Sequence, residues 1–172
     1  MLGDAGRSIP SSLFSMADMC YDSKENTKGI LMVDCPSPVV IRPKLAYYVM
    51  QRLFSTVPNN ITAAPSVSAD LHVHSDVNAG GASDDGDTQA FAFRDATGRM
   101  LYAFWLSGAK PTNGSDTITV NATLTVENPV KEPALIDLLS GAVYGGMAGG
   151  TSFTVPAIDS AMLLAERSMV PM

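Results

Sequence analysis

The amino-acid sequence predicts a mainly β protein, an antiparallel β-sandwich preceded by one N-terminal amphipathic helix. From about Ile61 onward, short runs of β-branched and aromatic residues are separated by clusters of Gly, Asn, Asp and Pro, as is typical of antiparallel strands joined by tight turns. Hydrophobic residues make up 46% of the 172 residues and charged residues 16%, so the chain can build a core and is not of the disordered class. One sandwich with an appended segment fits this length, so we expect residues 1–60 to form a strand–helix segment and residues 61–172 the sandwich.

The N-terminal segment contains one predicted strand and one predicted helix. Lys28–Asp34 (KGILMVD) is a short apolar run that predicts a strand buried on both faces, and a Pro-rich loop, Cys35–Arg42, follows it. Pro43 favours the first turn of a helix, and Pro58 stops it. The apolar stripe of this helix, along which the stem of Arg52 lies, consists of Leu45, Tyr48, Val49 and Leu53.

The sandwich segment contains two predicted hairpins and several further strands. Ala90–Arg94 and Met100–Leu106 form the first hairpin, in whose turn Gly98 supplies a positive φ. Ala134–Asp137 and Ala142–Tyr144 form the second hairpin. The other expected strands are Leu71–Ser75, Thr117–Val126 with alternating apolar and polar residues, Thr151–Val155 with Pro156 at a strand end or a sheet edge, and Ala161–Ala165.

Charge and cysteine content exclude several classes of function. Eleven Lys and Arg stand against 17 Asp and Glu, a net charge of −6, which disfavours binding to nucleic acid or to a membrane surface. The first residues lack the pattern of a signal peptide and no run of about 18 apolar residues occurs, so we expect neither export nor a membrane span, and the cellular location stays open. Cys20 and Cys35 are too few for a disulfide scaffold or a zinc site; buried free thiols are expected, and their pairing is left open.

Several segments together resemble a known family. NTKGILMVD and RPKLAYYVMQRLFSTV are similar to the last barrel strand and the final helix of clan-A, TIM-barrel glycoside hydrolases. ALIDLLSGAVYGG and TSFTVPAIDSAMLL resemble the hairpin and the strand pair that close the C-terminal β-sandwich of those enzymes. The resemblance runs from about Thr27 to Glu166 and implies a relative or a fragment of a glycosidase that keeps the non-catalytic part.

The resemblance carries over no catalytic residue. Enzymes of this clan need two carboxylates at the ends of the fourth and seventh barrel strands, and both strands would precede the similar region. The acidic residues before Lys28 lie in no recognisable motif of that kind; they are Asp4, Asp18, Asp22 and Glu25. We therefore expect that this chain alone is not an enzyme, although its parent family is, and we expect no cofactor.

Two small groups of residues are candidate ligand sites. His72 and His74 alternate along a strand and so share a face, as two metal ligands would, although an exposed polar strand face explains them more simply. Tyr102 and Trp105 belong to an aromatic-rich hairpin, and aromatic side chains are a common platform for carbohydrate. Alternation places Tyr102 with Phe104 on one face and Trp105 with Ala103 on the other.

The sequence thus leaves three hypotheses about function. The first is a non-catalytic β-sandwich accessory domain, structural or carbohydrate-associated. The second is a fragment of an active glycoside hydrolase without its barrel, and the third is an independent structural or oligomerisation protein. A chain on its own must cover the apolar faces of residues 29–34 and 45–54, so we expect a homo-oligomer, a dimer first of all, through the N-terminal strand and helix.

Overall fold

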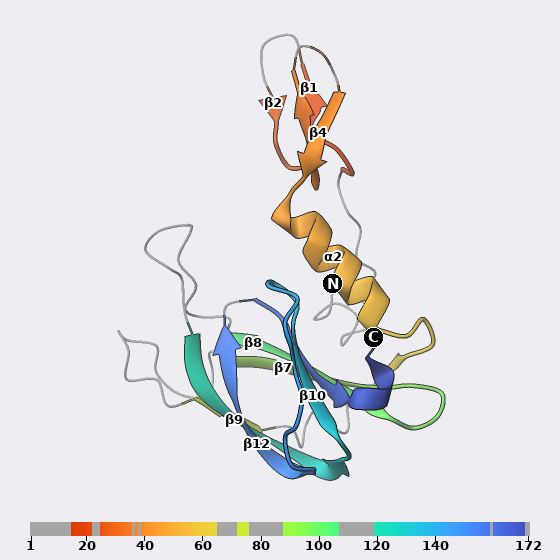
Figure 1. Ribbon diagram of the computed structural model, residues 1–172, viewed down its shortest axis with the longest axis vertical. Helices are drawn as coiled ribbons and strands as arrows, with labels where there is room; N and C mark the ends of the chain where they lie inside the picture. The colour runs from red at the N-terminus through yellow and green to blue at the C-terminus, as the bar shows by residue number, and fades with distance from the viewer. Residues whose placement is uncertain are drawn as a thin grey trace.

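The computed structural model describes residues 15–21, 25–35, 37, 39–64, 72–75, 88–106, 119–158 and 160–170. Strands predominate, and two antiparallel sheets form a sandwich, which confirms the predicted fold class (Figure 1). The larger sheet has the strand order β11-β10-β13-β8-β7-β5, and the smaller one β12-β9-β6. The bounds of these strands are β5 Thr62–Ala63, β6 His72–Ser75, β7 Thr88–Arg94, β8 Met100–Leu106, β9 Thr119–Val130, β10 Pro133–Asp137, β11 Val143–Tyr144, β12 Gly150–Ile158 and β13 Met162–Glu166.

The main core lies between the two sheets. Alternate residues of β8 and β9 point into it, so Tyr102 and Phe104 of one sheet face Leu124 and Val126 of the other. Phe153 and Val155 complete the smaller sheet's contribution. The strict alternation along β9, where Ala122 and Leu124 are buried, is the one that the sequence predicts.

A second cluster of buried residues lies on the other face of the six-stranded sheet. Phe93, Leu101 and Leu163 of this outer face pack against Leu53 of helix α2 (Leu45–Thr56). Met169 packs against the same face. It lies in the 3-10 helix η2 (Arg167–Met169), which follows the last strand, β13. The six-stranded sheet is therefore a middle layer. The smaller sheet covers one of its faces, and α2 and η2 cover the other.

Both predicted hairpins are present. In the β7–β8 turn Gly98 has φ +87°, and in the β10–β11 turn Gly141 has φ +83°, a region that favours glycine. β12 is longer than predicted and continues through Pro156, which pairs with Asn121. Proline is tolerated there because β12 lies at an edge of its sheet.

The N-terminal segment differs from the prediction. The strand is β3 (Leu31–Asp34), and its residues are half-buried or exposed rather than buried on both faces. The predicted loop Cys35–Arg42 contains most of a second strand, β4 (Val39–Pro43), which pairs antiparallel with β3. Its β-branched residues favour an extended backbone, and β3 requires a hydrogen-bonding partner.

Pro43 consequently ends β4 instead of opening the helix, and α2 begins at Leu45. Ahead of β3 lies a further two-stranded sheet, β1 (Met19–Cys20) with β2 (Glu25–Asn26). We call the described residues between 15 and 44 the arm. α2 rises from the sandwich and carries the arm at its far end, so the molecule is elongated (Figure 1).

Candidate functional site

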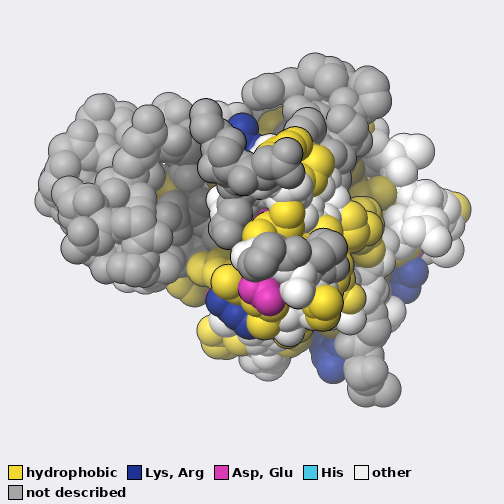
Figure 2. All heavy atoms as spheres, turned by 90° about the horizontal axis from the view of Figure 1, so that it is seen from above, with side chains coloured by type: hydrophobic (Ala, Val, Ile, Leu, Met, Phe, Trp, Pro, Cys, Tyr) yellow, Lys and Arg dark blue, Asp and Glu magenta, His cyan; other side chains and the backbone are white. Residues whose placement is uncertain are grey.

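The arm and the first half of α2 expose a row of large apolar side chains. Eight of the ten large hydrophobic residues that are exposed in the described chain lie between Met16 and Phe54. Five of them follow one another along the chain in β4 and the first half of α2, and we call them the apolar row: Val39, Val40, Ile41, Leu45 and Tyr48. Val39 is 63% exposed and Leu45 57%, well above what a core position would show. Figure 2, which views the molecule from above, shows hydrophobic side chains over much of the described surface there.

β4 also offers backbone hydrogen-bonding groups. Its only partner among the described strands is β3, so its other edge is free of pairing within that part of the chain. An unpaired edge with apolar side chains is a surface onto which a further strand can add. A bulge at Ile41, between the pairs Met32–Arg42 and Val33–Val40, bends this edge.

Arg52 fixes the orientation of α2 on the sandwich. Its Nη1 donates to the carbonyl oxygen of Leu138 at 3.0 Å and also to that of Leu139, both in the β10–β11 turn. A Cβ at Gly141 would lie 2.6 Å from Arg52 Nε, so a side chain there would displace the guanidinium, and the φ of +83° favours glycine in addition. Asp137 holds the turn by accepting from the N–H of Leu139 at 2.8 Å. The second half of α2 is thus anchored, and the first half presents Leu45 and Tyr48.

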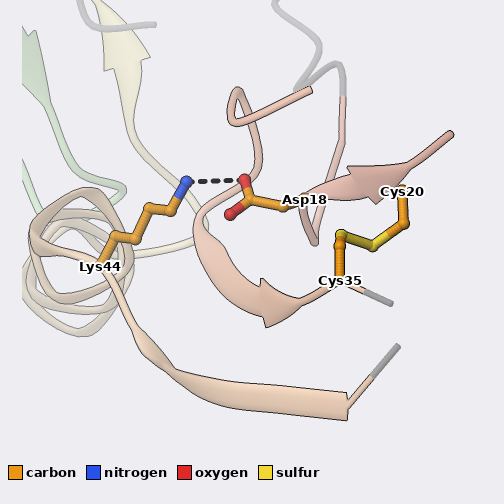
Figure 3. Close-up of a disulfide and its surroundings, with 4 residues drawn as sticks. All are labelled: Asp18, Cys20, Cys35 and Lys44. Carbon is orange, nitrogen blue, oxygen red and sulfur yellow. Dashed lines mark hydrogen bonds and ion pairs between the residues drawn. A yellow bond between two sulfur atoms is a disulfide. The ribbon is translucent and has the colours of Figure 1, made fainter. Parts of the chain in front are cut away.

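A disulfide between Cys20 and Cys35 joins the two small sheets of the arm (Figure 3). Cys20 ends β1 and Cys35 directly follows β3, with Cα atoms 5.7 Å apart. The expectation of buried free thiols is therefore wrong. The bond ties together strands that the sequence alone does not place side by side.

An ion pair between Lys44 and Asp18 stabilises the same part of the arm as the disulfide. Lys44 Nζ lies 2.6 Å from Asp18 Oδ1, and the two side chains point toward one another in Figure 3. The hydrogen bond from Lys44 lowers the pKa of Asp18 below its usual value, against the burial that would raise it. Asp18 also accepts from the N–H of Gly29, where a Cβ would lie 2.1 Å from the carbonyl carbon of Ala17. Only glycine allows this close approach of the two backbones.

The two residues predicted to bind carbohydrate lie in different environments. Tyr102 is fully buried between the sheets, so a ligand in solvent cannot reach it. Trp105 is half-buried on the outer face of the six-stranded sheet, where its ring stacks on Phe91 with centroids 5.5 Å apart. The structure therefore does not bring Tyr102 and Trp105 together, as the strand alternation already indicates.

The predicted metal ligands lie on an edge strand. β6 pairs with β9 so that His72 is opposite Thr125 and His74 is opposite Thr123. These threonines alternate along β9 with the buried Ala122 and Leu124. Within the described ranges, no group of three or more His, Cys, Asp or Glu residues is arranged to hold a metal ion.

The most strongly perturbed carboxylate among the described residues has a structural role. Burial alone would raise the pKa of Asp95, but hydrogen bonds from Thr97 and Arg99 lower it to about 2. Arg99 also pairs with Asp95 Oδ2 at 2.7 Å and donates to Ser168 Oγ at 3.2 Å. This network ties the β7–β8 turn to η2, and sequence reasoning did not identify it.

Comparison with family models and with curated proteins adds no relative. No family model matches the chain, and no curated protein is similar to it. None of the helices in the described ranges has the length and the apolar character needed to cross a membrane.

Proposed function

We propose that the chain is a non-catalytic β-sandwich accessory module of the glycoside-hydrolase type with a structural role, and that its apolar row is a docking surface. The observation that carries the proposal is the concentration of exposed apolar side chains in the arm and α2, beside a sandwich whose described residues form a buried core. The resemblance of residues 27–57 to the end of a barrel supports the same function, because that segment would pack against other structure.

A second copy of the chain is the occupant that we propose for this surface. A two-fold contact can pair the free edge of β4 with itself in antiparallel orientation, while Leu45 and Tyr48 flank the new sheet. Half-exposed apolar side chains offer on the order of 100 Å² each, so the five members of the row supply at most on the order of 500 Å² per partner. That area is typical of weak, reversible interfaces, and the expected dissociation constant is in the micromolar range.

The test is sedimentation velocity over a concentration series, with Val40→Asp compared with Val143→Asp. The two valines are similarly exposed, 50% and 45%, but Val143 lies on β11, outside the row. We expect Val40→Asp to abolish the dimer and Val143→Asp to leave it, because only the first buries a charge in the contact. A wild-type chain that is monomeric at every concentration overturns self-association and favours the fragment hypothesis, in which a barrel covers the row.

Carbohydrate binding at Trp105 is a second candidate function. The half-buried Trp105–Phe91 stack is the observation that favours it, and Gln89, opposite Trp105 in the sheet register, adds an amide for hydroxyl groups. Trp105 is the only tryptophan of the chain, so its fluorescence reports directly on a ligand. A glycan screen in which binding changes this fluorescence and Trp105→Ala abolishes binding would support the site. If no glycan binds, carbohydrate binding at Trp105 is ruled out as a function.

A further inference from the structure

The arm has almost no apolar core of its own. Among its described residues only Asp18, Gly29 and Ile30 are buried, and one of these is a charged residue. Small folds that bury so little apolar surface depend on cross-links or other tight contacts. In the arm these contacts are the disulfide, the Asp18–Lys44 pair and a few backbone hydrogen bonds.

The disulfide holds the strands on which the other contacts depend. Cys20 follows Asp18 by two residues, and the backbone of Asp18 donates to the carbonyl oxygen of Leu31 in β3 at 3.0 Å. The same strand pairs with β4, which carries the apolar row. Among the described residues, the contacts that hold this part of the arm together besides the covalent bond are hydrogen bonds and the Asp18–Lys44 ion pair, and a single hydrogen bond contributes only about 1 kcal/mol.

We propose that the Cys20–Cys35 disulfide is a redox control of the arm: the oxidised arm is ordered and presents the apolar row, and the reduced arm loses its order. Neither Cys20 nor Cys35 is fully buried, and thiol–disulfide exchange requires such access to the bond. The disulfide accepts two electrons and two protons to give two cysteine thiols, while a dithiol reductant is oxidised to its cyclic disulfide. The sandwich contains no cysteine and keeps its fold in both states.

Hydrogen exchange read by mass spectrometry, on the full chain with and without dithiothreitol, tests this proposal. Reduction should accelerate exchange at residues 16–35 by about ten-fold or more and leave β8 and β9 unchanged. The double variant Cys20→Ser with Cys35→Ser should resemble the reduced chain whether or not the reductant is present. Equal protection of the arm in both states, or two free thiols in the unreduced protein by thiol titration, would overturn the proposal.

The effect of reduction on docking rests on the function proposed above, and sedimentation of the same samples separates the two claims. If reduction loosens the arm but the oxidised chain is monomeric, the redox control stands and the docking function fails. If the oxidised chain is a dimer and reduction leaves the arm protected, the docking function stands and the redox control fails.

Discussion

The phenol of Tyr102 is buried in the sandwich without a hydrogen-bond partner among the described residues. Burial raises the pKa of Tyr102, which keeps its hydroxyl neutral. A buried polar group that makes no hydrogen bond has lost its contacts with water and gained nothing in return. The aromatic ring, in contrast, fills the centre of the core next to Phe104 and Leu124.

Tyr102→Phe should therefore leave the free energy of unfolding unchanged within about 0.5 kcal/mol, or raise it, because the substitution removes only the unsatisfied hydroxyl. Tyr102→Ala, the matched control, should cost about 3–5 kcal/mol through the cavity that it leaves. Urea denaturation of both variants measures the difference. A loss of more than about 1 kcal/mol for Tyr102→Phe would show that the hydroxyl has a partner, such as an internal water.

The lowered pKa of Asp95 predicts that the stability of the fold decreases at acid pH. Its folded-state pKa of about 2 lies below the ordinary value of 3.8, so its stabilising contribution is present above about pH 4 and is lost as the pH falls through about 2. The thermal midpoint of Asp95→Asn should lie below that of the wild type near neutral pH, and the gap should close in this acid range. Asp34→Asn, at an exposed position, is the control and should show no such gap. A gap that is constant with pH would contradict the assignment.

At the residue scale, the sequence predicted the backbone conformation of a turn, but it did not predict the hydrogen-bond partners of long side chains. Gly98 was predicted from its place between two strands, since a tight hairpin needs a positive φ there. The partners of Arg52 and Lys44 lie 86 and 26 residues away, respectively, so no local pattern indicates them. The pairing of Cys20 with Cys35 was missed for the same reason, because two cysteines alone do not show that their strands are neighbours.

Helix α2 has two halves with different roles. Leu53 packs on the outer face of the six-stranded sheet, and Arg52 is hydrogen-bonded to the β10–β11 turn, whereas Leu45 and Tyr48 of the same stripe are exposed. The predicted amphipathic stripe is therefore confirmed, but only its C-terminal part is covered. The periodicity of a helix shows which face is apolar; it does not show what covers that face.

Arg52→Ala tests the anchoring of this helix. The variant loses two hydrogen bonds to carbonyl oxygens from a charged donor, and we expect the free energy of unfolding to fall by about 1.5–3 kcal/mol. Gln51→Ala, the control, removes an exposed side chain at the preceding position. It should change the free energy of unfolding by less than about 0.5 kcal/mol. Chemical denaturation measures both variants. Equal stabilities would show that the turn does not hold the helix.

The β3–β4 hairpin is the element for which the sequence-based prediction was wrong. The run ILMV predicted a strand buried on both faces, which needs neighbouring strands and helices to cover it. In the described chain the only strand that pairs with β3 is β4, so the hairpin is half-exposed. The disulfide compensates for the missing core: closing a loop of 15 residues contributes about 3 kcal/mol by restricting the unfolded chain.

At the scale of the whole molecule, a sandwich with a buried core is joined to an arm that buries few of its described residues. The sandwich buries apolar residues on both faces of its larger sheet, and its fold class followed from strand alternation and turn residues. The arm and α2 together contribute eight of the ten exposed large hydrophobic side chains of the described chain. A prediction from sequence can identify such a surface, but not its occupant, because the occupant lies in another molecule or in another part of a longer one.

Hydrogen exchange as a function of protein concentration tests the docking role of the apolar row most directly, because it reports association and its location together. We expect protection of residues 39–48 to rise with concentration through the micromolar range, and protection of β11, at Val143 and Tyr144, to stay unchanged. Protection that is independent of concentration, or that rises at β11 and not at β4, would contradict it.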